Sequence, residues 1–280
     1  MERIGVVGAG TMGHGIAQVA ATAGCQVRWF DSNGDTLRAG RDRISANLEK
    51  AVKLGKLDAA QPVLDRIELV AAITDVAADA ELVVEAIPEN IEWKIALFSE
   101  VVRHSPERCI LATNTSSLSV TRIAHALADP SRVIGTHFFN PVHLMTLIEI
   151  VVGELTNDDV LQRTQEWCTQ LGKDVIVIQD TPGFATSRLG VCLGMEAVRM
   201  VEQGVASPED IDKAMVLGYR HPIGPLRLTD MVGLDVRLAI GEYLAKELCN
   251  PAFEPPKLMR RMVAEGLLGK KTGRGFYDWP

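Results

Sequence analysis

The first thirty-one residues place a glycine-rich turn between two apolar segments, and this arrangement constrains the fold more than any other feature of the chain. Residues 3–7 and 26–30 have the apolar composition of short buried strands. A Gly-x-Gly-x-x-Gly turn at residues 8–13 and a helical apolar pattern lie between them. The turn alone is common. Together with the preceding strand, the following helix and the acidic residue Asp31, it predicts a Rossmann-type βαβ unit.

The same turn predicts a dinucleotide cofactor. The residues expected to contact it are Gly8, Ala9, Gly10, Thr11, Met12 and Gly13. Gly8 permits the tight turn, Gly10 lets the pyrophosphate approach the backbone, and Gly13 lets the helix pack closely on the strand. The N-terminus of that helix offers unpaired N–H groups and a partial positive charge to phosphates. The alternative is an ordinary βαβ turn that binds no cofactor.

Asp31 indicates which dinucleotide to expect. A carboxylate at the end of the second strand accepts hydrogen bonds from the ribose hydroxyls and repels a 2′-phosphate, so NAD is favoured over NADP. Arg28 and Arg38 lie close to Asp31 in the sequence and keep NADP open as an alternative.

Strand and helix patterns alternate up to about residue 179 and then only helix patterns follow. Further strands are predicted at residues 67–70, 82–87, 109–113, 147–151 and 173–179, and within the stretch 132–141, where a strand is expected to end at His137. We therefore predict a doubly wound Rossmann-type domain over residues 1–182, a linker near 180–184 and an all-helical domain over residues 183–280. Helices of the second domain are predicted at residues 185–203, from Ser207 onward, at 226–248 and at 256–268. Its apolar surface is a candidate to bind an acyl chain, a second subunit, or both.

A histidine and a carboxylate occur in two neighbouring strand patterns. His137 follows a β-branched run and precedes two aromatic residues and an Asn-Pro stop, and Glu149 interrupts the apolar run 147–151. An unpaired carboxylate among Ile and Val is costly, so Glu149 needs a partner, and His137 is the nearest plausible one. Histidine also suits proton transfer near neutral pH. The alternative for His137 is a structural histidine of the core.

Ser116 lies in a polar turn, Asn114-Thr-Ser-Ser117, that follows a predicted buried strand. Ligands of open α/β sheets bind at the carboxyl ends of strands, so Ser116 is a candidate to hydrogen-bond a reacting oxygen. It is equally suited to cap the next helix, a role that Ser117 or Ser119 can also take.

Lys50, Lys53 and Lys56 recur every three residues on a predicted helix. In an acidic protein such a row is a candidate contact for a polyanionic substrate, and a solvated helix face is the alternative.

Composition excludes several classes of partner. The net charge of −7 argues against nucleic acid and anionic membranes, and no apolar run approaches the roughly 20 residues of a membrane span. No secretory signal precedes the first strand, so we expect a cytoplasmic protein. The five cysteines are scattered and form no Cys-x-x-Cys pair, which indicates free thiols in a reducing compartment. The histidines have no metal-ligand spacing, and we predict no metal site.

Seven motifs spread over nearly the whole chain together resemble those of the short-chain L-3-hydroxyacyl-CoA dehydrogenases, and most closely the bacterial 3-hydroxybutyryl-CoA subgroup. They are residues 8–13 with Asp31, Val84–Asn90, Asn114–Leu118, His137–Pro141, Asp180–Phe184, Gly224-Pro225 with Asp230, and Gly269–Gly273. Asn-Thr-Ser-Ser followed at this spacing by His-Phe-Phe-Asn-Pro is highly specific.

The resemblance implies a role for each of several residues. His137 would be the catalytic base for oxidation of the 3-hydroxyl, Glu149 would hold and stabilise its imidazole, and Ser116 would bind the substrate oxygen. The residues implied around the cofactor are Glu89, Lys94, Ser116, Asn140 and Lys271. The region from Lys50 to Lys56, with Lys50 and Lys53 as candidates, would meet the phosphates of coenzyme A. The helical domain would form a homodimer.

Ser187 departs from the family pattern, which usually has Asn three residues after the Phe of Pro-Gly-Phe. An amide reaches further than a hydroxyl and both donates and accepts, so Ser187 is expected to change substrate anchoring or chain-length preference, with a bridging water as one solution.

The sequence predicts an NAD-dependent 3-hydroxyacyl-CoA dehydrogenase. Two alternatives stay open: a related dehydrogenase of a free hydroxy acid or sugar acid, and an NAD-binding scaffold without turnover.

Overall fold

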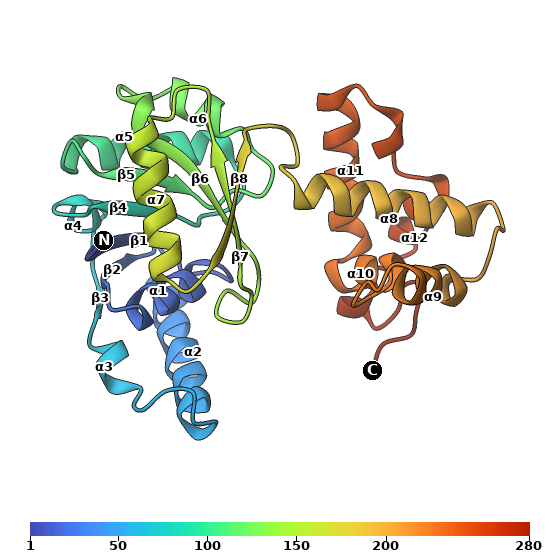
Figure 1. Cartoon of the computed structure of the whole chain (residues 1–280), viewed down its shortest axis with the longest axis horizontal. Helices are drawn as coiled ribbons and strands as arrows, with labels where there is room; N and C mark the ends of the chain where they lie inside the picture. Colours follow the sequence, from blue (N-terminus) through green and yellow to red (C-terminus); the bar gives the residue numbers. More distant parts are fainter. The chain divides into compact units, whose positions relative to one another are not determined.

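The computed structural model of the chain describes residues 1–280 and divides into two compact units, Met1–Thr181 and Pro182–Pro280 (Figure 1). The division lies within the residues 180–184 that the sequence marked as a linker.

The first unit is built on one eight-stranded sheet with the strand order β3-β2-β1-β4-β5-β6-β7-β8. All neighbouring strands are parallel except β6 and β7, which are antiparallel. The strands are β1 Arg3–Val7, β2 Gln26–Phe30, β3 Ile67–Leu69, β4 Leu82–Glu85, β5 Ile110–Thr113, β6 Val133–Phe138, β7 Leu147–Val152 and β8 Asp174–Gln179. The predicted Rossmann-type fold is confirmed.

Helices cover both faces of the sheet. Successive residues of a strand point to opposite faces, so each strand packs against helices on both sides. Val6 of β1 packs in one buried cluster with Ile16 of the first helix. Gly5 faces the other way, and Val76 of α4 lies where its side chain would be. The helices are α1 Gly13–Thr22, α2 Gly34–Lys53, α3 Gln61–Leu64, α4 Ile73–Ala77, α5 Ile91–His104, α6 Val120–His125 and α7 Asp158–Gln170, with a 3₁₀ turn η1 at Pro130–Arg132. Strands β4, β5 and β6 are buried along their whole length, as strands covered on two faces should be.

The order of the strands reverses at β1, which pairs with β2 on one side and with β4 on the other. Crossovers leave β1 and β4 in opposite directions along the sheet, which opens a crevice at their carboxyl ends. A bound ligand is therefore expected beside Val7 and Glu85.

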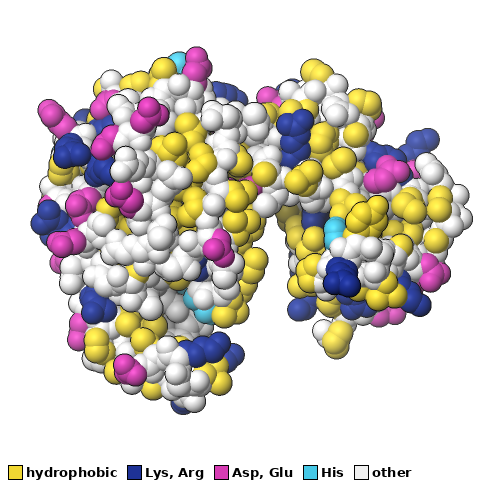
Figure 2. Space-filling view, viewed as in Figure 1, with side chains coloured by type: hydrophobic (Ala, Val, Ile, Leu, Met, Phe, Trp, Pro, Cys, Tyr) yellow, Lys and Arg dark blue, Asp and Glu magenta, His cyan; other side chains and the backbone are white.

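The second unit is helical and has its own apolar core. Its helices are α8 Thr186–Glu202, α9 Pro208–Gly218, α10 Pro225–Val232, α11 Leu234–Leu248 and α12 Lys257–Ala264, with 3₁₀ turns η2 Pro251–Phe253 and η3 Lys270–Thr272. Val191, Met195 and Val198 of α8 pack against Leu226 of α10 and Leu244 of α11. Hydrophobic side chains are also visible on the surface of this unit (Figure 2).

The single helix predicted over residues 226–248 is wrong, because the chain breaks it into α10 and α11 at Gly233. Gly233 has φ +106°, which only glycine adopts readily, and it ends one helix and begins the next. The helix predicted over 256–268 is also shorter than expected. It ends at Ala264, and Gly266 follows with φ +77°.

None of the helices is long and apolar enough to cross a membrane. All five cysteines are free thiols.

Candidate active site

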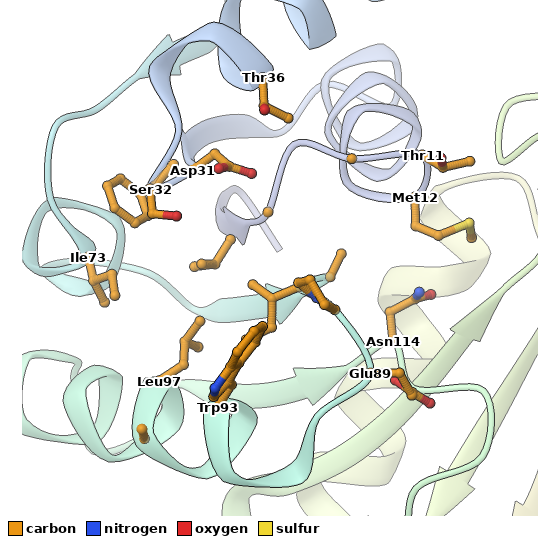
Figure 3. Close-up of a pocket in the computed structure, with 18 of the residues that line it drawn as sticks. Thr11, Met12, Asp31, Ser32, Thr36, Ile73, Glu89, Trp93, Leu97 and Asn114 are labelled. Carbon is orange, nitrogen blue, oxygen red and sulfur yellow. The ribbon is translucent and has the colours of Figure 1, made fainter.

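A pocket of about 1050 Å³ opens at the carboxyl ends of the central strands, where the strand order reverses (Figure 3). Its wall comes from the glycine turn, the end of β2, the segment after β4, helix α5, the turn after β5 and the end of β6. Among the residues that line it are Gly8, Gly10, Thr11, Met12, Asp31, Glu89, Trp93, Leu97, Asn114, Ser116 and His137. The labelled side chains in Figure 3 surround one cavity, and two of them, Thr36 of α2 and Ile73 of α4, add these helices to its wall.

The three glycines of the turn meet three different demands. Gly8 has φ +106°, and the carbonyl oxygen of Ala86 lies 2.5 Å from where a Cβ would be. A Cβ on Gly13 would lie 1.9 Å from the carbonyl oxygen of Gly8, so only glycine allows α1 to approach β1 this closely. A Cβ on Gly10 would have no atom within 4 Å. The fold itself therefore does not require glycine at position 10. A ligand that approaches the backbone there would require it, because a Cβ would occupy the same space.

The N-terminus of α1 has no side-chain cap, and its N-cap residue is Met12. The first turns of α2, α5 and α6 are capped by Asn33, Asn90 and Ser119. An uncapped helix start beside the pocket leaves N–H donors and the positive end of the helix dipole for an anionic group.

Asp31 lies at the end of β2 and lines the pocket. Its Oδ2 accepts the N–H of Ala9 at 2.7 Å and its Oδ1 accepts the N–H of Asn33 at 2.8 Å. These bonds fix the carboxylate between the glycine turn and the start of α2, and each oxygen keeps a lone pair for a further donor. With Gly10 and the uncapped helix, the residues present fit a dinucleotide whose adenosine ribose carries free hydroxyls.

His137 and Glu149 are directly opposed residues of the antiparallel pair β6–β7. The imidazole Nδ1 lies 2.6 Å from Oε2 of Glu149, and the ring of Phe139 is tilted against the imidazole with centroids 4.6 Å apart. Glu149 has no solvent exposure and His137 has 8%. A carboxylate at Nδ1 favours the tautomer in which Nδ1 carries the proton and Nε2 is the basic nitrogen.

Glu89 holds the turn that contains Ser116. Its Oε1 accepts hydrogen bonds from the hydroxyls of Thr115, Ser116 and Ser117 at 2.5, 3.4 and 3.3 Å and from two backbone N–H groups of the same turn. Burial raises the pKa of Glu89, but the ammonium of Lys94 and the bonds from Thr115 and Ser116 outweigh it, so this pKa lies below its ordinary value. The hydroxyl of Ser116 thus stands at the pocket wall on a turn fixed by a carboxylate, while Ser119 caps α6.

Two functional groups of this region were not singled out from the sequence. Glu85 at the end of β4 is fully buried, and its oxygens accept hydrogen bonds from Lys94 Nζ at 2.6 Å and from Thr113 Oγ1 at 2.7 Å. Asn114 lines the pocket and its Oδ1 accepts the N–H of Phe138 at 3.0 Å, which ties the turn after β5 to the strand end that bears His137. The signal for Glu85 was the one used for Glu149, a single carboxylate in an apolar strand.

Other residues predicted for the site do not line this pocket. Lys94 is buried beneath it and also lies 3.4 Å from Glu89. Asn140 is exposed and precedes Pro141 through a cis peptide bond. Lys50 and Lys53 are exposed in the last turns of α2.

Two further predicted residues belong to the second unit. Lys271 forms an ion pair with Asp235, with Nζ 2.6 Å from Oδ2, and Ser187 is a half-buried residue of the first turn of α8.

Comparison with known families assigns both units. A family model described as the NAD-binding domain of 3-hydroxyacyl-CoA dehydrogenase matches residues 3–181. The model of the C-terminal domain of 3-hydroxyacyl-CoA dehydrogenase matches residues 183–279.

Individual relatives match along the whole chain. A 3-hydroxybutyryl-CoA dehydrogenase of Mycobacterium tuberculosis is 44% identical, with 100% of this chain and 99% of that protein covered. A mitochondrial hydroxyacyl-coenzyme A dehydrogenase of Sus scrofa is 41% identical, with 100% of this chain and 91% of that protein covered. The solved structure of an (S)-3-hydroxybutyryl-CoA dehydrogenase from Ralstonia eutropha has a TM-score of 0.96 at 40% identity, with 100% and 99% covered.

Proposed function

This chain belongs to the 3-hydroxyacyl-CoA dehydrogenase family, a family of NAD-binding oxidoreductases, and we propose that it oxidises the 3-hydroxyl of L-3-hydroxyacyl-CoA substrates such as 3-hydroxybutyryl-CoA, reversibly, with His137 as the general base. The observation that carries the role of His137 is its 2.6 Å hydrogen bond to the buried Glu149, in a pocket that also contains the glycine turn.

The reaction needs a base at the substrate hydroxyl. A bound nicotinamide would supply the acceptor for the hydride that leaves C3 of the substrate. His137 takes the hydroxyl proton on Nε2 as the C3–O bond becomes a carbonyl, and in the reverse direction it returns that proton. The hydroxyl of Ser116, which lies 3.4 Å from Oε1 of Glu89, would turn from that carboxylate to donate its one hydrogen bond to the same substrate oxygen. A positioned base of this kind contributes about 10²–10⁴-fold in rate.

Glu149 acts through His137. Its carboxylate fixes the ring orientation and the tautomer, and it stabilises the imidazolium that forms when the proton is taken up. The opposed positions in β6 and β7 support this role, because two rigid, fully hydrogen-bonded strands hold the pair in place.

The cofactor is NAD. Gly10 and the uncapped start of α1 would hold the pyrophosphate, and Asp31 would accept hydrogen bonds from the ribose and repel a 2′-phosphate. By family resemblance Glu89, Ser116, Asn140 and Lys271 would lie around the cofactor, and Glu89 and Ser116 line the pocket that also contains His137.

The acyl group is carried by coenzyme A, whose phosphates would meet Lys50 and Lys53. Basic side chains are visible where α2 ends (Figure 2). By resemblance two copies assemble through the helical unit. The five free thiols support localisation in a reducing compartment, the cytoplasm.

A substrate comparison tests the function. Purified protein is assayed with acetoacetyl-CoA and NADH, then with NADPH, and with free acetoacetate and NADH, following nicotinamide absorbance. We expect turnover with NADH and acetoacetyl-CoA and at least tenfold lower kcat/KM when NADPH or the free acid is used. Equal activity on free acetoacetate would instead assign a hydroxy acid dehydrogenase, and bound NADH without turnover of any substrate would assign a scaffold.

A further inference from the structure

Four basic side chains of the first unit, His14, Lys50, His143 and Lys173, form a group that we call the histidine–lysine cluster. They come from α1, from the end of α2, from the loop after β6 and from the residue before β8. Partial burial of the imidazole and then the positive charges of His14, Lys173 and Lys50 lower the pKa of His143. Asp174, which follows Lys173 in the chain, is not among the charges that shift this pKa, and neither is any other carboxylate. The cluster therefore holds like charges whose repulsion no acid of the chain offsets.

A tight backbone contact brings the two histidines together. A Cβ on Gly15 would lie 2.7 Å from the Cβ of Val142, so α1 packs directly against the loop that follows β6. His14 precedes Gly15 and His143 follows Val142, so the two imidazoles flank this contact. Histidine and Lys or Arg side chains are visible close together on this part of the first unit (Figure 2).

Two members of the cluster are fixed by backbone carbonyls and keep a nitrogen for a ligand. Nζ of Lys173 donates to the carbonyl oxygens of Val142 and Met145, each at 2.6 Å, which leaves one of its three N–H groups. Nδ1 of His14 lies 2.8 Å from the carbonyl oxygen of Gly10. Because a carbonyl oxygen only accepts, Nδ1 carries the proton and Nε2 of His14 is left for a ligand.

The cluster adjoins the pocket of the first unit on the side away from the ribose site. Gly10 lines the pocket, and His14 is hydrogen-bonded to it. Thr36 at the start of α2 also lines the pocket, whereas Lys50 lies about 21 Å further along the helix axis. The cluster thus extends along α2 away from Asp31, and a second ligand of the pocket fits it better than the dinucleotide does.

We propose that the histidine–lysine cluster binds a phosphate group of the coenzyme A moiety, with His14 and His143 as phosphate ligands in addition to the lysines of α2. The inference rests on the proposed function, because it requires a coenzyme A thioester as the substrate. Imidazolium and ammonium groups donate charge-assisted hydrogen bonds to phosphate oxygens. A bound phosphate also offsets the repulsion within the cluster and raises the pKa of His143, so binding takes up a proton and strengthens as the pH falls.

Two substrates with the same reacting carbonyl test the inference. Acetoacetyl-CoA carries the phosphates, and acetoacetyl-pantetheine lacks them. We measure kcat/KM for both with NADH at pH 6.5 and pH 8, and we compare the ratio of the two values. The titration of His137 cancels in this ratio, because both substrates undergo the same chemical step. We expect the wild-type ratio to be about 3- to 10-fold larger at pH 6.5, the worth of one net hydrogen bond.

Three variants assign the pH effect to the cluster. In His14→Gln and in His143→Gln the ratio should lose most of its dependence on pH, whereas His125→Gln, at an exposed histidine of α6, should keep the wild-type dependence. A wild-type ratio that does not change with pH, or a change that both cluster variants retain, would overturn the inference. If one variant does not fold, the wild type and the other variant still decide the question.

A third substrate, acetoacetyl-3′-dephospho-CoA, identifies the phosphate group. A pH effect that disappears with this substrate assigns the 3′-phosphate, and one that persists assigns the pyrophosphate; both results support the cluster.

Other outcomes separate this inference from the proposed function. A raised NADH Kd in both cluster variants with an unchanged substrate ratio would assign the cluster to the cofactor and overturn the inference. Equal kcat/KM for acetoacetyl-CoA and acetoacetyl-pantetheine overturns only the role of the cluster, whereas turnover of neither thioester overturns the function.

Discussion

His137 and Glu149 face each other across the antiparallel strands β6 and β7, with 2.6 Å between Nδ1 of the imidazole and Oε2 of the carboxylate. A change at Glu149 should therefore act on the chemical step and leave cofactor binding alone. In Glu149→Gln we expect kcat for acetoacetyl-CoA reduction to fall by about 10²–10⁴-fold, because the amide neither fixes the tautomer nor stabilises the imidazolium. Stopped-flow fluorescence should show an unchanged NADH Kd.

Glu68→Gln is the matched control for that variant, since it neutralises an exposed carboxylate of strand β3. It should keep the wild-type kcat. A Glu149→Gln enzyme with full kcat would show that the pair is structural.

Gly10 and Gly13 should respond differently to the same substitution. Gly10→Ala is expected to keep the wild-type thermal midpoint, because its Cβ meets no atom of the protein, and to raise the NADH Kd at least tenfold, because the Cβ occupies the approach of the pyrophosphate. Gly13→Ala drives its Cβ into the carbonyl of Gly8 and should cost about 1–3 kcal/mol of folding free energy or more. Tight NADH binding by Gly10→Ala would place the pyrophosphate elsewhere.

Asp31 should set the preference between the two dinucleotides. Asp31→Asn keeps an acceptor for the backbone of the glycine turn and removes the charge that repels a 2′-phosphate. We expect the ratio of kcat/KM for NADH over NADPH to drop tenfold or more. Asp35→Asn, at an exposed carboxylate four residues later, should leave the ratio unchanged. An unchanged ratio in Asp31→Asn would exclude Asp31 as the selector.

Glu89 should make the stability of the first unit depend on pH in a defined direction. Its folded-state pKa is lowered, so its contribution is fully present above the ordinary carboxyl pKa of 4.5 and is lost as pH falls through the lower folded value. Chemical denaturation of wild type and Glu89→Gln should therefore differ most at pH 6 to 7, and the difference should shrink below about pH 4.

Glu92→Gln, at an exposed acid of α5, is the control for pH effects at the surface and should match the wild type throughout. A difference between wild type and Glu89→Gln that grows as the pH falls would contradict the sign given for Glu89.

Much of the first unit could be predicted from local patterns, because the residues that form each pattern lie close together in the sequence. The strand before the glycine turn, the helix after it and Asp31 all lie within one βαβ unit, whose geometry links sequence spacing to position. The contact of His137 with Glu149 could be anticipated because the chemistry of a buried acid demanded a partner.

Longer-range features were missed for identifiable reasons. The break between α10 and α11 depends on the positive φ of Gly233, and the apolar pattern continues through it. The pairing of Lys94 with Glu85 depends on how α5 packs beneath the pocket, and spacing along the chain does not encode this.

The most direct test of the central claim is the kcat of His137→Gln with acetoacetyl-CoA and NADH, measured beside its NADH Kd and beside His125→Gln at an exposed histidine of α6. Glutamine fills a similar space but exchanges no proton at neutral pH. The account predicts that kcat falls by about 10²–10⁴-fold while the NADH Kd stays unchanged, and that His125→Gln retains the wild-type kcat. A His137→Gln enzyme as fast as the wild type would contradict it.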